Sequence, residues 1–264
     1  KEAYVRFLSQ VKEGGKAVVC LDDPELSALL PSATGDFITY GTHPDAQYRA
    51  TDIVLGDRRA EFTVLSQGVP LGRVTIHVPG RHNVLNALAA LIVAMEAGVA
   101  FDKAAEALAE FSGAKRRFQV LGDAGGILVI DDYAHHPTEI IATIAAAKAT
   151  ERRIVAVFQP QRYTRTFYLL DSFSRAFGEA DEVIIVDIYS PAGEERIEGV
   201  SAARLPDLIR ERSNPNVTHI STKEEVLAKL ERESRPGDLV LTMGAGDIWQ
   251  VAKRFAQTLK ERQG

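Results

Sequence analysis

The second half of the chain repeats a strand followed by a helix at least four times, and this rhythm is the strongest constraint on its fold. The strands are short, almost uninterrupted apolar runs, which is typical of a parallel sheet covered by helices on both faces. The predicted pairs are strand 126–130 with helix 138–150, strand 153–158 with helix 166–178, strand 182–188 with helix 201–211, and strand 238–242 with a helix from 248 onward.

The first part of the chain has a different pattern. It opens with a predicted helix at 2–12, a strand at 16–21 and a helix start at Asp22-Asp23-Pro24. From about 36 to 78, short alternating runs separated by glycines indicate antiparallel strands. A strongly apolar helix at 81–97 and a second helix at about 101–111 follow. We place the domain boundary between Gly113 and Arg117, which gives domains at 1–114 and 115–264.

Composition excludes several classes of protein. With 45% hydrophobic residues among 264, the chain can bury a substantial core, so it is not disordered. A net charge of −5 with well-mixed signs offers no basic stripe for nucleic acid. The apolar stretches are too short or too interrupted to cross a membrane. The single cysteine, Cys20, lies among apolar residues and fits a reducing compartment. We expect a soluble, cytoplasmic protein, and the sequence does not indicate an oligomeric state.

Two asparagines open the apolar helix predicted at 81–97. Asn83 and Asn86 are three residues apart, so they lie on the same face of its first turns. A carboxamide offers both a donor and an acceptor, which matches the edge of an adenine. The alternative is a helix cap together with a satisfied buried amide.

A second polar cluster follows the strand at 126–130 and includes Asp132, Tyr133 and His135. At the carboxyl end of a parallel strand, a carboxylate can accept hydrogen bonds from a ribose and an imidazole can donate to a phosphate. The tandem His135 and His136 also suggest a metal, but adjacent residues leaving a strand point in different directions, which favours two separate roles. Glu139 can serve the helix start instead.

A third cluster, at 158–166, follows the next strand. Arg162 and Arg165 are three residues apart, and two guanidinium groups at a helix start suit a carboxylate or a phosphate. The alternative is a solvated helix start in which Asp171 pairs with an arginine. The glycine-rich turn at 243–247 lacks the third glycine of a dinucleotide signature and is interpreted as a tight connector. The sequence contains no Gly-x-x-x-x-Gly-Lys-Ser/Thr loop.

Taken together, these segments resemble the Mur ligase family, and within it the type that joins L-alanine to UDP-N-acetylmuramate. The resemblance extends over essentially the whole chain, in order and spacing, and rests on the segments 80–87, 115–118, 131–139, 158–166 and 191–194. It implies an α/β fold in which 1–114 is the C-terminal portion of a central ATP-binding domain with antiparallel strands. Residues 115–264 would then form a Rossmann-like, doubly wound C-terminal domain that binds the amino acid.

The resemblance also implies a chemistry, in which the muramate carboxylate attacks ATP to give an acyl phosphate that the amine of L-alanine captures. This reaction belongs to peptidoglycan precursor synthesis, and so to cell wall biogenesis, cell shape and cell division. The resemblance implies that the phosphate loop, and the Glu and His residues that help to hold Mg²⁺, precede Lys1. The chain alone is therefore expected to be an inactive fragment.

Site residues are carried over from the resemblance position by position. The expected ATP contacts are Asn83, Asn86, Arg117, Asp132 and His135. The residues expected to line the muramate and alanine site are Tyr133, Gln161, Arg162 and Arg165. The residues expected to take part in catalysis are Arg117, His135, Arg162 and Arg165. Gln161 departs from the family pattern, which has histidine there, and glutamine cannot carry a proton or a positive charge.

Two other functions compete with this one. A sister ligase would attach recycled peptides or a later amino acid, but the run Gln-Arg-Tyr-Thr-Arg-Thr at 161–166 resembles the alanine-adding type. A non-catalytic nucleotide-binding module would keep the fold without the ATPase, and the missing phosphate loop is its main support. A piece of a longer enzyme is the simpler interpretation.

Overall fold

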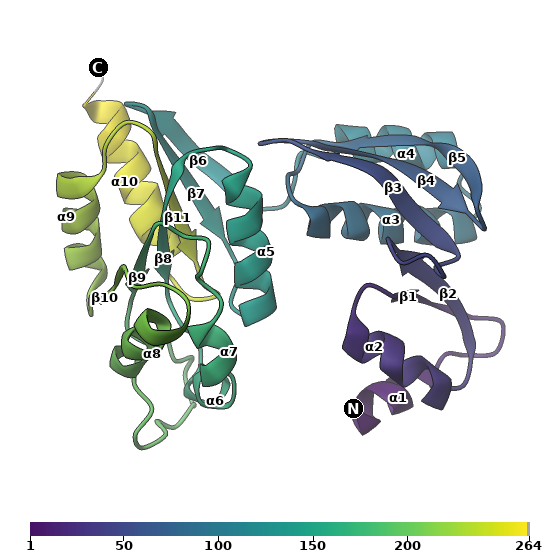
Figure 1. Ribbon diagram of the computed structural model, residues 1–264, viewed down its shortest axis with the longest axis horizontal. Coiled ribbons are helices and arrows are strands. Elements are labelled where there is room, and N and C mark those ends of the chain that lie inside the picture. The colour runs from purple at the N-terminus through teal and green to yellow at the C-terminus, as the bar shows by residue number, and fades with distance from the viewer. Residues whose placement is uncertain (263–264) are drawn as a thin grey trace. The chain divides into compact units, whose positions relative to one another are not determined.

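The computed structural model describes residues 1–262 and divides into two compact units, Lys1–Ser112 and Gly113–Gly264 (Figure 1). Each unit is built on its own sheet, with five strands in the first and six in the second. Within residues 1–262, no helix combines the length and the apolar character needed to cross a bilayer.

The first unit is a mixed sheet with the strand order β1-β2-β3-β4-β5. The strands are β1 (Lys16–Cys20), β2 (Asp36–Gly41), β3 (Tyr48–Leu55), β4 (Ala60–Ser66) and β5 (Val69–Ile76). The helices are α1 (Glu2–Leu8), α2 (Pro24–Leu29), the 3-10 turn η1 (Leu30–Ser32), α3 (Arg81–Glu96) and α4 (Phe101–Glu110).

The predicted antiparallel pairing is confirmed for β3, β4 and β5 but is wrong for β2, which runs parallel to both of its neighbours. The chain crosses over through α2 between β1 and β2, so β2 runs in the same direction as β1. β3 then starts beside the end of β2, where Tyr40 pairs with Tyr48. Alternation of apolar residues indicates a strand but not its direction, so the sequence pattern alone could not separate these cases.

Helix α3 supplies the core of the first unit. Its buried side chains Val84, Leu88 and Leu91 recur at helical spacing and pack on the sheet side chains Phe62 and Val64, all almost fully buried. This packing fixes the first two turns of α3, which carry the two asparagines, against the sheet.

The second unit has the strand order β10-β9-β8-β11-β7-β6, with every neighbouring pair parallel except β6 and β7. The strands are β6 (Gln119–Ala124), β7 (Ile127–Asp132), β8 (Arg153–Phe158), β9 (Glu182–Ile185), β10 (Val217–His219) and β11 (Asp238–Met243). The helices are α5 (Pro137–Lys148), α6 (Tyr163–Tyr168), α7 (Leu170–Ser174), the 3-10 turn η2 (Ala202–Arg204), α8 (Leu205–Arg212), α9 (Lys223–Glu233) and α10 (Trp249–Glu261).

Helices cover both faces of this second sheet, as the sequence predicted (Figure 1). Alternate residues of β7 enter two separate cores: Leu128 and Ile130 pack with α5, α7 and α8, whereas Val129 packs with α9 and α10. Several details differ from the prediction. The helix expected at 166–178 is divided into α6 and α7, and the segment 131–132 belongs to β7 rather than to the loop after it. The strand expected at 182–188 ends at Ile185, and the helix expected at 201–211 is the 3-10 turn η2 followed by α8.

The centre of the second sheet brings three strand ends to one level. β11 lies between β7 and β8, and Met243 is paired with Asp132 on one side and with Phe158 on the other. Because neighbouring strands are about 4.8 Å apart, the segments that leave β7 and β8 start roughly 10 Å from each other. The turn after β11 lies between them.

Candidate functional site

The carboxyl ends of β7, β11 and β8 hold most of the residues that the sequence singled out. In open α/β sheets this edge is where ligands bind. Three segments meet there: 133–136 after β7, 159–165 after β8 and 244–247 after β11.

Asp131, at the end of β7, is a buried anchor with 1% exposure. Its Oδ2 accepts a hydrogen bond from Arg116 Nε at 2.9 Å, and its Oδ1 accepts one from Thr242 Oγ1 at 2.8 Å. Burial raises the pKa of Asp131, although the hydrogen bonds from Arg116 and Thr242 act in the opposite direction. The carboxylate therefore ties β7 to β11 and to the segment before β6.

Asp132 is also buried, with 5% exposure. Its Oδ2 accepts a hydrogen bond from Phe118 N at 2.7 Å, and its Oδ1 accepts one from Ala134 N at 2.7 Å. This carboxylate holds the segment that enters the unit against the loop that leaves β7. The ribose contact expected of Asp132 stays a prediction.

The structure brings three of the predicted residues together after β7. The Tyr133 and His135 rings are arranged edge to face with centroids 5.3 Å apart, and Arg117 Cζ lies 5.7 Å from the Tyr133 centroid. The Arg117 side chain is 54% exposed, and its NH1 lies 3.7 Å from Glu139 Oε1. Arg117 is thus held loosely, at a position from which its guanidinium faces solvent.

The two tandem histidines make different contacts. His135 Nδ1 lies 2.9 Å from the Tyr133 carbonyl oxygen, which can only accept, so the proton is on Nδ1. Nε2 of His135 then accepts a hydrogen bond when the ring is neutral and donates one when it is charged. His136 is instead the N-cap of α5, where its side chain accepts from Thr138 N.

Glu139 closes the capping box of α5. Its Oε2 accepts hydrogen bonds from His135 N at 2.9 Å and from His136 N at 3.1 Å. Burial acts to raise the pKa of Glu139, but these hydrogen bonds and the nearby charges outweigh it, and the pKa is lowered. A lowered carboxyl pKa means that Glu139 stabilises the fold above the usual carboxyl range and that this stability is lost as the pH falls through the lowered value.

We expect Glu139→Gln to lower the free energy of unfolding by about 1 kcal/mol near neutral pH, the usual size of a capping contribution. The difference between variant and wild type should shrink as the pH falls from about 7 to about 3. Urea unfolding followed by the fluorescence of Trp249, the single tryptophan, measures it in the second unit. Glu179→Gln, at an exposed position of the same unit, is the control. A difference that did not change with pH would contradict the assignment.

The arginines after β8 differ in how they are held. Arg165 NH1 donates to Gln161 Oε1 at 2.9 Å, whereas Arg162 is exposed. Within residues 1–262 the Arg162 guanidinium has no hydrogen bond or ion pair. Asp171, which the sequence offered as an arginine partner, pairs with Arg175 and Arg212 rather than with Arg162 or Arg165. Arg162 therefore presents its positive charge to solvent.

Glu194 fastens the loop after β9 to the start of α6. Its Oε1 accepts from Thr164 Oγ1 at 2.9 Å and its Oε2 accepts from Ser190 Oγ at 3.0 Å. Slight burial acts to raise the pKa of Glu194, but the hydrogen bonds from Thr164 and Ser190 prevail and lower it. Sequence spacing did not indicate the hydrogen bond between Thr164 and Glu194, because these two residues are 30 positions apart.

The glycine-rich turn after β11 is filled by Gln159, which the sequence analysis missed. The Oε1 atom of Gln159 accepts from Asp247 N at 3.0 Å and from Ile248 N at 3.1 Å, and its Nε2 donates to Asp247 Oδ1. A Cβ on Gly246 would lie 2.4 Å from this Oε1. The free amides that a phosphate would need here are already used, which supports the connector interpretation of the turn.

In the first unit, Asn83 and Asn86 do share a face of α3. Asn86 Nδ2 donates to Asn83 Oδ1 at 3.3 Å, and Asn83 Nδ2 donates to the Pro79 carbonyl at 2.7 Å. Asn86 is exposed, whereas Asn83 is half-buried. The two side-chain amides are thus hydrogen-bonded to each other, and the Asn86 amide is exposed to solvent.

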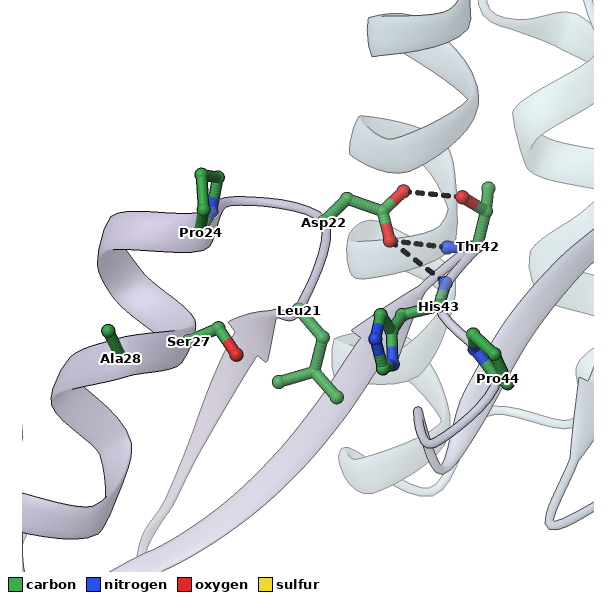
Figure 2. Close-up of a pocket in the computed structure, with 8 residues that line it drawn as sticks. All are labelled: Leu21, Asp22, Pro24, Ser27, Ala28, Thr42, His43 and Pro44. Atoms are coloured by element: carbon green, nitrogen blue, oxygen red, sulfur yellow. Dashed lines mark hydrogen bonds between the residues drawn. The ribbon is translucent and has the colours of Figure 1, made fainter.

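A pocket of about 780 Å³ lies at the carboxyl ends of β1 and β2 in the same unit (Figure 2). Asp22 points toward Thr42 and His43, accepting from Thr42 N at 2.7 Å, Thr42 Oγ1 at 2.8 Å and His43 N at 3.0 Å. Arg81, the first residue of α3, donates to Thr42 Oγ1 at 2.9 Å. The pocket therefore adjoins the first residue of α3, the helix that carries the asparagines, and the sequence pattern gave no sign of it. Its lining residues are Leu21, Asp22, Pro24, Ser27, Ala28, Thr42, His43 and Pro44.

Comparison with known proteins agrees with this architecture. A UDP-N-acetylmuramate–L-alanine ligase of Symbiobacterium thermophilum is 48% identical over 268 residues, covering 99% of this chain and 56% of that protein. The crystal structure of the UDP-N-acetylmuramate-alanine ligase of Thermotoga maritima aligns with a TM-score of 0.71 at 28% identity, over 93% of this chain and 51% of that one. The MurF ligase of Thermotoga maritima, solved in complex with ADP, shares the fold with a TM-score of 0.71 at 18% identity, over 99% and 57% of the two chains.

The chain thus spans little more than half the length of the relatives it matches. Two family models match it one after the other: the Mur ligase middle domain matches residues 1–94, and the Mur ligase, glutamate ligase domain matches residues 116–246. Since these two models fall on the two sheets in turn and leave little of the chain unmatched, the chain belongs to the Mur ligase family.

Proposed function

We propose that this chain is part of an ATP-dependent ligase that joins L-alanine to the carboxylate of UDP-N-acetylmuramate. The observation that carries the proposal is the 48% identity, over 99% of the chain, to a relative named for that reaction. The strand pairing supports the proposal as well. Because β7, β11 and β8 end at the same edge of the sheet, the segments after β7 and β8 carry Tyr133, His135, Arg162 and Arg165 along that edge.

The proposed reaction has two steps. The muramate carboxylate attacks the γ-phosphorus of ATP, the bond to the ADP oxygen breaks, and an acyl phosphate forms. The amine of L-alanine then attacks the carbonyl carbon, inorganic phosphate leaves with the bonding electrons, and the nitrogen gives up a proton. Both steps gather negative charge, which cationic side chains must balance.

Arg162 and Arg165 supply that charge on the amino-acid side of the proposal. Arg162 has an exposed guanidinium, and Gln161 orients Arg165 through a hydrogen bond of 2.9 Å. Planar guanidinium forks suit the carboxylate of alanine or of muramate. Tyr133 completes this side with an aromatic surface. Glutamine at 161 can orient its neighbour but cannot relay a proton, so we propose no acid or base role for it.

The proposed nucleotide contacts are assigned to each unit separately. Asn86, through its exposed amide, and Asn83 next to it would contact the adenine. Asp132 would accept from the ribose, while Arg117 and His135 would contact the phosphates, His135 donating through Nε2 when it is charged. The cofactor of the proposal is ATP.

Mg²⁺ enters the proposal only from the family resemblance. Among residues 1–262, no three His, Cys, Asp or Glu side chains come together as a set that could hold a metal ion. The proposal therefore assigns no magnesium ligand among these residues, and no step above depends on one. The proposed partners are the three substrates, with a cytoplasmic location that follows from them.

The test is a ligation assay on the full-length protein that contains this chain. With UDP-N-acetylmuramate and ATP, we expect release of ADP and phosphate that requires an amine and is fastest with L-alanine. A peptide that begins with L-alanine is the competing donor, and preference for it would show the peptide-recycling type instead. ATP binding without any ligation would support a non-catalytic module and overturn the proposal.

Arg165→Ala in that protein is expected to raise the KM for L-alanine or UDP-N-acetylmuramate roughly 30-fold, since a charged hydrogen bond contributes about 2 kcal/mol. The KM for ATP should change less than about threefold. Arg175→Ala, which removes an exposed arginine paired with Asp171, is the matched control and should leave all three values unchanged. An equal rise for all three substrates would contradict the placement of Arg165.

A further inference from the structure

Two neighbouring arginines at the entrance to the second unit are held in opposite ways. Arg117 is 54% exposed, with only a loose contact to Glu139. The Arg116 side chain is 21% exposed and donates to three acceptors: Asp131 Oδ2 at 2.9 Å, the Gly244 carbonyl at 2.6 Å and the Gly246 carbonyl at 3.1 Å. The Arg117 guanidinium therefore has few contacts, whereas the Arg116 guanidinium is held by three acceptors.

The acceptors of Arg116 come from two different strand ends. Asp131 ends β7, and the two glycine carbonyls belong to the turn after β11. The Arg116 Cζ atom also lies 4.9 Å from the Tyr133 ring centroid, within cation–π distance. A single guanidinium thus connects the entering segment to the carboxyl ends of β7 and β11 and to the aromatic ring of the candidate site.

The backbone around Arg116 is also held by hydrogen bonds. The Arg116 carbonyl accepts from Tyr133 N at 2.7 Å, and Phe118 N donates to Asp132 Oδ2 at 2.7 Å. Arg116 and Phe118 both have positive φ, at 59° and 48°, a conformation that costs a non-glycine residue about 1 kcal/mol or more. The hydrogen bonds around Asp131 and Asp132 hold the segment in this conformation.

We propose that Arg116 is a positioning residue, which fixes the segment 114–118 to the carboxyl edge of the second sheet so that Arg117 and Tyr133 are presented together. The role rests on the proposed function, because Arg117 is the residue that would touch the nucleotide. Lysine could not replace Arg116, since its single ammonium cannot reach a carboxylate and two carbonyls in the planar arrangement that the guanidinium serves.

The first experiment needs no ligase activity and uses this chain as it is. Amide hydrogen exchange by NMR is compared for wild type, Arg116→Lys and Arg117→Lys. We expect Arg116→Lys to speed exchange of the Tyr133 and Phe118 amides about tenfold or more, because their acceptors are no longer held in place. Arg117→Lys should not change them, and the Leu241 amide in the core of β11 should be unchanged in both variants. Equal exchange in wild type and Arg116→Lys would overturn the proposal.

The second experiment is a double-mutant cycle on the full-length protein in the ligation assay. Arg116→Lys is expected to lower kcat/KM for ATP about tenfold, with kcat/KM for L-alanine at saturating ATP changed much less. In an Arg117→Lys background the same change should have little further effect, because Arg116 acts through Arg117. Independent, multiplicative effects would overturn the positioning role, even if the variant unfolds more easily.

The two experiments separate the two proposals. If the wild-type protein does not ligate, the proposed function fails, while the exchange data still decide whether Arg116 holds the segment. If it ligates and the exchange of Arg116→Lys is normal, the proposed function stands and the positioning role fails.

Discussion

Asp131→Ala is expected to lower the free energy of unfolding of the second unit by about 3 kcal/mol, because removing one partner of a buried ion pair leaves the other partner uncompensated. Arg116 would keep its two carbonyl acceptors but lose its counter-charge, and Thr242 Oγ1 would keep only the longer hydrogen bond to the Ile130 carbonyl, at 3.4 Å. Urea unfolding followed by Trp249 fluorescence reports on this unit alone, which matters because two units need not unfold together.

Two further variants make the result specific. Asp131→Asn keeps an oxygen in place and should lose about half as much as the alanine variant. Asp207→Ala removes an exposed aspartate from an ion pair with Arg210 on α8 and should change stability by about 0.5 kcal/mol or less. If Asp131→Ala were as mild as Asp207→Ala, the buried pair would not be an anchor.

Gly246→Ala is expected to destabilise the second unit by about 3 kcal/mol and to disturb the segment after β8 at the same time. The added Cβ would meet Gln159 Oε1 at 2.4 Å and Tyr189 Cγ at 2.6 Å. Gln159 cannot simply move aside, because its side chain accepts two backbone hydrogen bonds and donates a third. Overpacking and broken buried hydrogen bonds each cost about 1 to 3 kcal/mol.

The disturbance should spread through Tyr189, whose carbonyl accepts from Arg162 N. Thermal unfolding and the NMR shifts of the Arg162 amide measure both effects. Gly178→Ala is the matched control, since a Cβ there would come no closer than 3.6 Å to any neighbour, and it should change stability by less than about 0.5 kcal/mol. A normal Arg162 shift in Gly246→Ala would show that the turn and the arginine loop are independent.

Most of the second unit could be predicted from the sequence, because its strands are continuous apolar runs followed by amphipathic helices. What was missed has local causes. β10 is only three residues long, and α9 has mostly charged residues, so neither gave a clear signal. The strand was predicted to end before Asp131 and Asp132, because carboxylates are costly to bury. In the structure β7 includes both residues, because Arg116 Nε and Phe118 N donate hydrogen bonds to their carboxylates.

The candidate site was predictable where the chemistry depends on local spacing. Asn83 and Asn86 are three residues apart, and the structure does bring their amides into contact. The choice between Arg116 and Arg117 could not be made that way, because both have the same chemistry and Arg116 takes its partners from residues up to 130 positions away. Such contacts depend on the strand order of the sheet, which cannot be predicted from the spacing of nearby residues.

That topology has a consequence for how the protein is made. β11 follows β6 to β10 in the sequence, yet it occupies the slot between β7 and β8, which are not hydrogen-bonded to each other. In a nascent chain that has emerged only as far as α9, the edges of β7 and β8 that will later pair with β11 have no partner strand. Their free backbone N–H and C=O groups can then pair with other chains. Ribosome-bound intermediates of that length should need chaperone protection until synthesis of the final strand joins β7 and β8.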